Sequence, residues 1–195
     1  MRPHRAWLLA LALLLAACGG GEGWHLKNVT GVVPDLEFRL TDDSGRKVSA
    51  ADYRGQAVML FFGYTNCPDV CPTTLAKLAA AMKQMGEAAQ HVRVLFVTVD
   101  PKRDTLQVLH EYVRAFGPRI TGLRGSQTEL QTLAKRYRIT YSYGKPDANG
   151  DYEVTHSSAV FVFDAEGKAR LMVLPDDGQK AIAEDLKRLL AEQQG

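Results

Sequence analysis

The chain has 195 residues, of which 46% are hydrophobic and 24% are charged, a composition that suits one globular domain with an ordinary core. Its formal net charge is +2, and Arg2 and Arg5 account for that excess. The chain after residue 17 therefore carries equal numbers of acidic and basic residues, which argues against a nucleic-acid-binding protein.

The first residues have the pattern of a secretory signal peptide. Two arginines precede an apolar run, residues 7–17, which is too short for an ordinary membrane span and ends in Leu15-Ala16-Ala17-Cys18. This ending resembles the lipobox of bacterial lipoproteins, which implies cleavage before Cys18 and lipidation of its sulfur. The alternative is a secreted protein with a coincidental cysteine.

Three segments follow from this pattern. We expect a lipoprotein signal peptide over residues 1–17, a lipidated Cys18 with a flexible glycine-rich tether over residues 18–33, and a folded domain over residues 34–195. A diacyl anchor holds a protein firmly at a membrane surface. The expected location is extracytoplasmic, on the periplasmic side of the cell membrane.

Residues 34–49 predict a β-hairpin. Leu36, Phe38 and Leu40 alternate with polar residues, and Val48 follows the turn signal Asp42-Asp43-Ser44-Gly45.

Cys67 and Cys71 lie in a turn between an apolar run, residues 57–62, and an Ala/Leu-rich helical pattern over residues 73–85. At a helix N-terminus the backbone N–H groups and the macrodipole favour the thiolate, which is the form that attacks disulfides and binds metals. Residues four apart face the same side of a helix. If Cys18 is lipidated, the remaining pair closes almost no loop, so it indicates redox or metal chemistry rather than a stabilising disulfide.

The rest of the chain alternates strands and helices. The run over residues 92–99 predicts a strand buried on both faces, and Asp104 or Thr105 can cap the following helix, which runs to about residue 116. The further predictions are a short strand at 120–123, a helix at 128–137, a surface hairpin or flap at 141–152, strands at 159–163 and 169–173, and a final amphipathic helix at 177–192.

This order of elements is the thioredoxin-like plan. We expect an α/β fold with a central mixed sheet flanked by helices on both faces, carrying an N-terminal hairpin and an inserted flap. Ligands of such sheets bind at the carboxyl ends of the parallel strands, where Cys67 and Cys71 would lie.

Several motifs resemble the Sco/SenC family of copper chaperones in order and spacing, from about residue 34 to residue 190. They are Phe62-Gly63-Tyr64-Thr65, Cys67-Pro68-Asp69-Val70-Cys71-Pro72-Thr73-Thr74, Val99-Asp100-Pro101 with Arg103-Asp104-Thr105, and a segment over residues 152–163 centred on His156-Ser157. The resemblance implies a copper site made from Cys67, Cys71 and His156. It also implies a role in assembling the dinuclear copper centre of cytochrome c oxidase.

Two residues depart from the family pattern. Asn66 stands where the family often has histidine before the first cysteine, and Thr155 stands where aspartate often precedes the ligand histidine. Neither change removes a ligand, but neighbouring groups orient ligands, so both changes bear on copper affinity and partner contacts.

The residue types themselves leave alternatives open for His156. Two thiolates and one imidazole form a soft set that suits Cu(I), and a fourth ligand or water could complete Cu(II). Zinc can occupy the same atoms. Without the resemblance, a hydrogen-bonded surface or core histidine is the favoured interpretation of His156, and we expect His91 and His110 to be solvated.

Two functions compete. The first is a membrane-anchored copper metallochaperone, a binding protein rather than an enzyme, that passes copper to cytochrome c oxidase subunit II by ligand exchange; another copper chaperone or a thiol-disulfide reductase would be further partners. The alternative is a thiol-disulfide reductase in which Cys67 and Cys71 form the redox-active pair and keep the oxidase cysteines reduced. Copper binding needs His156, and disulfide exchange does not. A peroxidase is a weaker third reading, because no separate resolving cysteine is present.

Overall fold

The computed structural model describes residues 23–148 and 150–193. The predicted signal peptide and the predicted lipidation of Cys18 fall outside these residues. None of the helices in the described part of the chain has the length and apolar character needed to cross a membrane.

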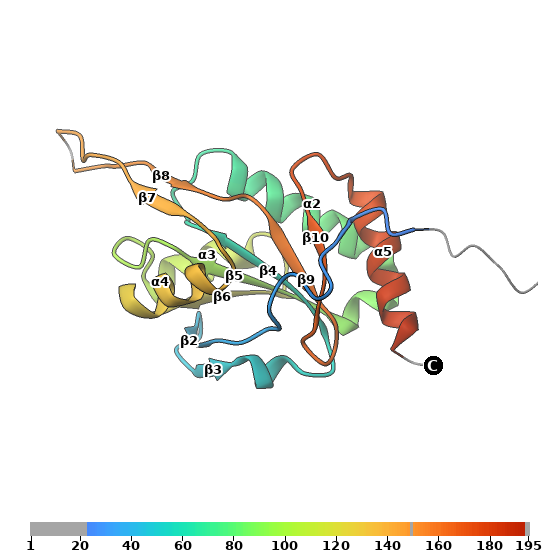
Figure 1. The fold of residues 1–195 in the computed structure, drawn as a ribbon. Coiled ribbons are helices and arrows are strands. Elements are labelled where there is room, and N and C mark those ends of the chain that lie inside the picture. Colours follow the sequence, from blue (N-terminus) through green and yellow to red (C-terminus); the bar gives the residue numbers. More distant parts are fainter. Residues whose placement is uncertain (1–22, 149, 194–195) are drawn as a thin grey trace, which may run out of the picture.

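The centre of the molecule is one large mixed sheet (Figure 1). In spatial order its strands are β1 (Lys27–Asn28), β10 (Ala169–Val173), β9 (Val160–Phe163), β4 (Ala57–Gly63), β5 (Val92–Thr98), β6 (Ile120–Arg124), β2 (Arg39–Asp42) and β3 (Lys47–Ser49). Strands β4, β5 and β6 are parallel, and the other pairs are antiparallel. The apolar runs predicted at residues 57–62 and 92–99 thus form the centre of the sheet, where every side chain of β4 is buried.

Helices cover both faces of this sheet, as predicted. They are α2 (Val70–Met85), α3 (Leu106–Arg114), α4 (Gln127–Arg136) and α5 (Gln179–Glu192), with 3-10 turns η2 (Ala50–Tyr53) and η3 (Gly86–His91). Successive side chains of a strand point to opposite faces. On one face Phe61 contacts Phe96, which in turn contacts Tyr112 of α3. On the other face Phe62 contacts Tyr137, which follows α4. Helices α2 and α5 pack against each other.

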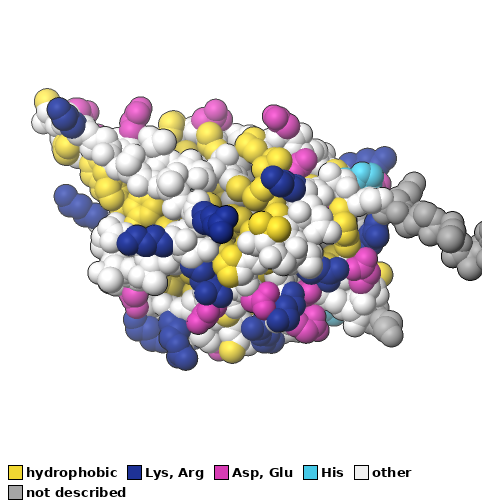
Figure 2. Space-filling model, viewed as in Figure 1, with side chains coloured by type: hydrophobic (Ala, Val, Ile, Leu, Met, Phe, Trp, Pro, Cys, Tyr) yellow, Lys and Arg dark blue, Asp and Glu magenta, His cyan; other side chains and the backbone are white. Residues whose placement is uncertain are grey.

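The predicted flap is a separate two-stranded sheet, β7 (Tyr141–Tyr143) and β8 (Val154–His156). It projects from the body of the molecule (Figure 1). Figure 2 shows hydrophobic side chains along the underside of this flap and charges of both signs scattered over the viewed face.

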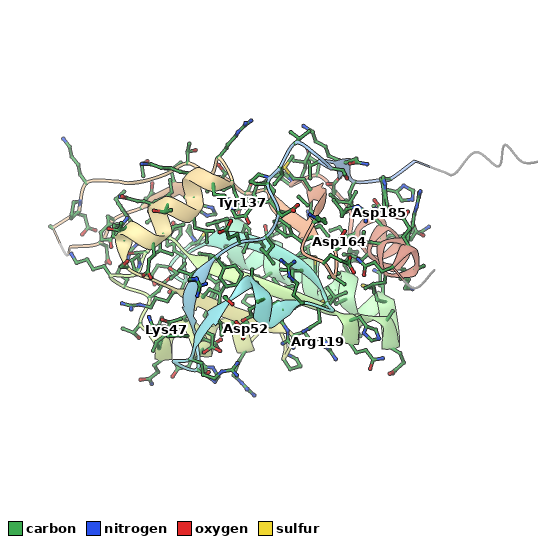
Figure 3. All side chains as sticks on the ribbon, turned by 60° about the horizontal axis from the view of Figure 1, so that its bottom comes forward. Lys47, Asp52, Arg119, Tyr137, Asp164 and Asp185 are labelled. Carbon is green, nitrogen blue, oxygen red and sulfur yellow. The ribbon has the colours of Figure 1, made fainter. Side chains whose placement is uncertain are left out.

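The end of the predicted tether is packed into the domain. Strand β1 pairs with β10 at an edge of the sheet. Leu26, which is 2% exposed, donates its N–H to the buried carboxylate of Asp185 at 2.7 Å. Asp185, labelled in Figure 3, belongs to α5. The folded part of the chain therefore begins before residue 34. Glycines at residues 19–23 suggested a tether, but Leu26 and Val29 bring apolar side chains that the sheet edge can bury.

Helix α2 also begins earlier than predicted, at Val70 rather than at Thr73. Pro72 does not prevent this start, because the first N–H groups of a helix have no intrahelical acceptor and a proline there loses no bond. The early start places Cys71 in the first turn of the helix.

Candidate metal centre

The structure brings Cys67, Cys71 and His156 together. Cys67 lies in the turn after β4, Cys71 in the first turn of α2, and His156 is the last residue of β8. The Sγ atom of Cys71 is 3.2 Å from Nε2 of His156, and the three candidate ligand atoms all lie within 4.8 Å of one another. The group sits at the carboxyl end of the parallel strands, where the fold predicted it.

The two cysteines occupy different environments. Cys71 is fully buried, whereas Cys67 is partly exposed, and both are free thiols. The backbone N–H of Cys71 points to Sγ of Cys67, with a nitrogen–sulfur distance of 3.4 Å. Gly63 makes room for the buried sulfur, because a Cβ at this position would lie 2.8 Å from Sγ of Cys71. The last residue of β4 therefore has to be small.

His156 is held by its second ring nitrogen. Nδ1 lies 3.0 Å from the carbonyl oxygen of Ser157, which can only accept, so Nδ1 carries the proton and Nε2 presents its lone pair toward Cys71. The ring of Tyr64 meets the imidazole edge-on, with centroids 5.8 Å apart and planes at 90°. A second-nitrogen bond of this kind fixes both the tautomer and the direction of a metal-binding histidine.

Burial keeps the metal-free pair of Cys71 and His156 neutral. It raises the pKa of the Cys71 thiol, against a smaller opposing effect of the backbone bond from Tyr64. It also lowers the pKa of His156, against the opposing effect of its bond to Ser157. The expectation that the helix N-terminus favours the thiolate is therefore wrong for Cys71, because loss of solvent outweighs the backbone dipoles. A metal ion would have to displace the thiol proton.

The donor set fits a soft metal ion. A transition-metal ion lies about 2.3 Å from a thiolate sulfur and about 2.0 Å from an imidazole nitrogen, so ligand atoms that share one are typically separated by less than 5 Å. The spacing here meets that requirement. Two sulfurs and one nitrogen favour Cu(I) or zinc over the hard cations Mg²⁺ and Ca²⁺.

Asp104 has a different role from the one predicted. Thr105 caps α3 by accepting a bond from the N–H of Val108, so Asp104 is not the cap. Its buried carboxylate instead accepts bonds from the hydroxyl of Thr98 and from both the N–H and the hydroxyl of Thr65. It thereby ties the cysteine-bearing turn to the loop after β5.

The remaining candidates lie around the group or away from it. Asp69 precedes α2 and accepts a bond from the hydroxyl of Thr73. Asn66 is exposed and lines a pocket of about 520 Å³ between the turn and the flap, while Thr155 pairs with Ser142 inside the flap. His110, predicted to be solvated, is 43% exposed and pairs with Asp43 at 2.7 Å from the middle of α3.

Sequence reasoning gave no role to three residues near the group, Asp100, Arg103 and Tyr152. Arg103 lies between the rings of Tyr64 and Tyr152 and also bonds to Asp100. All three residues lie in the motifs that resemble the family, and this was the signal that could have identified them. Their contacts could not be predicted, because they join segments about 50 residues apart.

Comparison with known proteins shows the family to which the chain belongs. The SCO1/SenC family model matches residues 33–191. The chain belongs to the SCO1/SenC family. The mitochondrial SCO2 homolog of Bos taurus is 42% identical over 133 residues, which cover 67% of this chain and 50% of that protein. The chain thus spans about half the length of the curated relatives it matches.

Solved Sco structures confirm the thioredoxin-like fold. Arabidopsis thaliana ScoI with copper bound is 33% identical, has a TM-score of 0.75, and is matched over 81% of this chain and 98% of its own. Bradyrhizobium japonicum ScoI with copper bound is also 33% identical, with a TM-score of 0.74 and coverage of 80% and 99%. The predicted family and fold are therefore confirmed.

Proposed function

We propose that this Sco/SenC protein is a copper metallochaperone that binds copper through Cys67, Cys71 and His156 and delivers it during cytochrome c oxidase assembly. The observation that carries the proposal is the convergence of two sulfurs and one oriented imidazole nitrogen at the sheet rim. The copper-bound relatives support the choice of copper over zinc.

The uneven burial of the two thiols suits transfer of a metal rather than its permanent storage. Cys67 is partly exposed, so a partner thiolate can approach the metal from its side while Cys71 and His156 still hold it. Transfer then proceeds by ligand exchange, in which each incoming thiolate replaces one of the three ligands. Binding releases the thiol protons, and departure of the metal lets Cys71 take its proton back.

The recipient we propose is subunit II of cytochrome c oxidase, whose dinuclear copper centre the family resemblance implies as the target. Another copper chaperone or a thiol-disulfide reductase would load or reduce the site. We further propose attachment to the periplasmic side of the cell membrane through lipidated Cys18, which rests on the residue pattern of the first 18 residues.

Copper titration of the reduced protein tests the ligand set. The chain from residue 24 onward is compared with His156→Ala and with His110→Ala, a control in which the lost histidine pairs with Asp43 instead. We expect one copper ion per protein in the parent and in the control. Loss of one of three ligands should weaken Cu(I) binding by at least about tenfold in His156→Ala. A chelator competition for Cu(I) and the thiolate charge-transfer absorption of Cu(II) report the result.

Equal copper affinity in the parent and in His156→Ala would contradict the proposed site. The second candidate function, a thiol-disulfide reductase, is favoured by the partly exposed Cys67 beside the N–H of Cys71. Such a protein would reduce a disulfide substrate at the same rate with and without His156, and would lose that activity in Cys67→Ser.

A further inference from the structure

His156 is not a residue of the central sheet, although its imidazole lies edge-on to the ring of Phe61 in β4, with centroids 6.2 Å apart. His156 ends strand β8, which pairs only with β7 in the separate two-stranded sheet, and the central sheet resumes at Val160. Cys71, by contrast, is buried in α2 against the sheet. Contacts between the flap and the rim of the central sheet therefore act together with the Phe61 contact to set where the imidazole lies relative to the sulfur.

Three residues, which we call the rim clamp, make these contacts: Asp100, Arg103 and Tyr152. Asp100 follows β5, and its two carboxylate oxygens accept from different partners, the hydroxyl of Tyr152 at 2.8 Å and Nε of Arg103. The guanidinium of Arg103 also lies over the Tyr152 ring, 3.8 Å from its centroid. One carboxylate and one guanidinium thus hold the flap from two directions.

A further bond supports the clamp. The hydroxyl of Tyr143, on the other strand of the flap, donates to the carbonyl oxygen of Val99 at 2.6 Å. Both tyrosines therefore anchor the flap at the carboxyl end of β5, where β5 leads into the loop that carries Arg103.

The clamp extends to the histidine through one more ring. The guanidinium of Arg103 lies 5.8 Å from the centroid of Tyr64, and the Tyr64 ring meets the His156 imidazole edge-on at 5.8 Å. Tyr64 itself is 4% exposed and follows β4, just before the cysteine turn. Tyr152, Arg103, Tyr64 and His156 therefore form a continuous contact chain from the flap to the candidate metal centre.

Burial makes the clamp sensitive to the loss of any one member. Asp100 is 1% exposed, so its charge is tolerated only with hydrogen-bonding partners. The Arg103 side chain is 19% exposed. Burial and the bond to Asp100 raise the pKa of Tyr152 to about 12, so its hydroxyl remains a donor at neutral pH.

We propose that the rim clamp is a positioning device that holds the flap so that His156 lies against Cys71. Arg103 and Tyr152 are not ligands, yet the affinity of the group for Cu(I) depends on them, a consequence that rests on the proposed function. Outer groups that orient a metal ligand typically contribute a factor of about 10–100 in affinity.

The test uses two clamp variants and two matched controls. Tyr152→Phe removes the hydroxyl and keeps the ring, and Arg103→Met removes the guanidinium. Tyr137→Phe removes a hydroxyl that donates to the backbone oxygen of Asp35, outside the flap. Arg188→Met removes a guanidinium of α5 that lies over the Trp24 ring, 4.3 Å from its centroid. Thermal unfolding confirms that each variant is folded, and Tyr152→Phe alone carries the test if Arg103→Met does not fold.

Cu(I) competition is then measured for each variant in the parent and in the His156→Ala background. We expect the clamp variants to weaken binding by about 10–100-fold in the parent background and to add almost nothing once His156 is absent. The controls should stay within about twofold in both backgrounds. Equal losses with and without His156 would overturn the proposal, because the clamp would then act on general stability rather than on this ligand.

A metal-free measurement separates this proposal from the proposed function. The alkylation rate of Cys71, followed by mass spectrometry, should rise severalfold in Tyr152→Phe and Arg103→Met and remain unchanged in the two controls. If the alkylation rate of Cys71 is unchanged in the clamp variants, the rim clamp does not position His156 against Cys71, and this conclusion does not depend on the copper measurements. A raised rate together with copper binding that ignores His156 would retain the clamp and reject the proposed copper site.

Discussion

Cys67 and Cys71 are four residues apart, but the chemistry available to each differs. Cys71 lies on the inner side of the first turn of α2, where β4 and the imidazole of His156 exclude water. Cys67 lies in the turn before the helix and keeps contact with solvent. The inner thiol is therefore suited to retaining a metal, and the outer thiol is suited to receiving an incoming partner.

This difference predicts the order in which the thiols react. In the reduced, metal-free protein, a small alkylating reagent should modify Cys67 first, because burial both covers the Cys71 sulfur and raises the pKa of its thiol. Peptide mass spectrometry over a time course gives the two rates. In the chain from residue 24 onward, Cys67→Ser leaves only Cys71, and its reaction should proceed slowly from the start. Modification of both cysteines at the same rate would contradict the burial of Cys71.

At the scale of elements, the β2–β3 hairpin depends on one buried side chain. Asp42 accepts bonds from the N–H and hydroxyl of Ser44 and from the N–H and Nε of Arg46. Burial opposes ionisation of Asp42, but the hydrogen bonds from the Ser44 hydroxyl and from Arg46, together with the charge of Arg46, outweigh it and hold its pKa below the ordinary value of 3.8. The carboxylate thus accepts hydrogen bonds from backbone N–H groups in the tight turn, in place of a backbone carbonyl.

Asp42→Ala should lower the free energy of unfolding by about 1–3 kcal/mol at pH 7, since it removes four hydrogen bonds to the ionised carboxylate of a buried residue. A group whose pKa is lower in the folded state stabilises the fold above its unfolded-state pKa, and this contribution is lost as the pH falls through the folded-state pKa. The difference between parent and variant should therefore shrink below pH 3.8. Urea unfolding at pH 7 and at about pH 3 measures it, with exposed Asp176→Ala as the control. A difference that is independent of pH would show that the ionised carboxylate is not the stabilising form.

At the scale of the whole molecule, the segment before the predicted domain closes one edge of the sheet. Strand β1 covers β10, and Leu26 is tied to α5 through Asp185 (Figure 3). An edge strand covered in this way no longer offers unpaired backbone groups to other chains. The N-terminal segment is therefore part of the folded unit.

Leu26→Ala should reduce the free energy of unfolding by about 2–5 kcal/mol, because its side chain is buried and its removal leaves a cavity. Val32→Ala is the matched control, since Val32 lies in the same segment but is 70% exposed, and it should change stability by no more than about 0.5 kcal/mol. Denaturant unfolding compares both variants with the parent. Unchanged stability in Leu26→Ala would show that this segment is a tether and does not stabilise the folded domain.

Much of the fold was predictable because its signals are local. The alternation of Leu36, Phe38 and Leu40 fixes which face of the N-terminal segment is buried, and the turn Asp42-Asp43-Ser44-Gly45 that follows fixes the hairpin. Continuous apolar runs gave β4 and β5. Two boundaries differ from the prediction because a local signal misleads. Pro72 suggested a later start of α2, and the glycines before Leu26 suggested a later start of the folded domain.

The sequence by itself determined the kind of chemistry: two thiols four residues apart after an apolar strand, and a histidine in a family motif. Only the tertiary structure decided how these groups meet, because the contact between Cys71 and His156 joins residues 85 apart in the chain. Local patterns cannot specify which side chains a distant flap will contact or which thiol loses its solvent. Burial of Cys71, orientation of His156 by Ser157 and the rim clamp all arise from packing between separate elements, which acts only once the chain has folded.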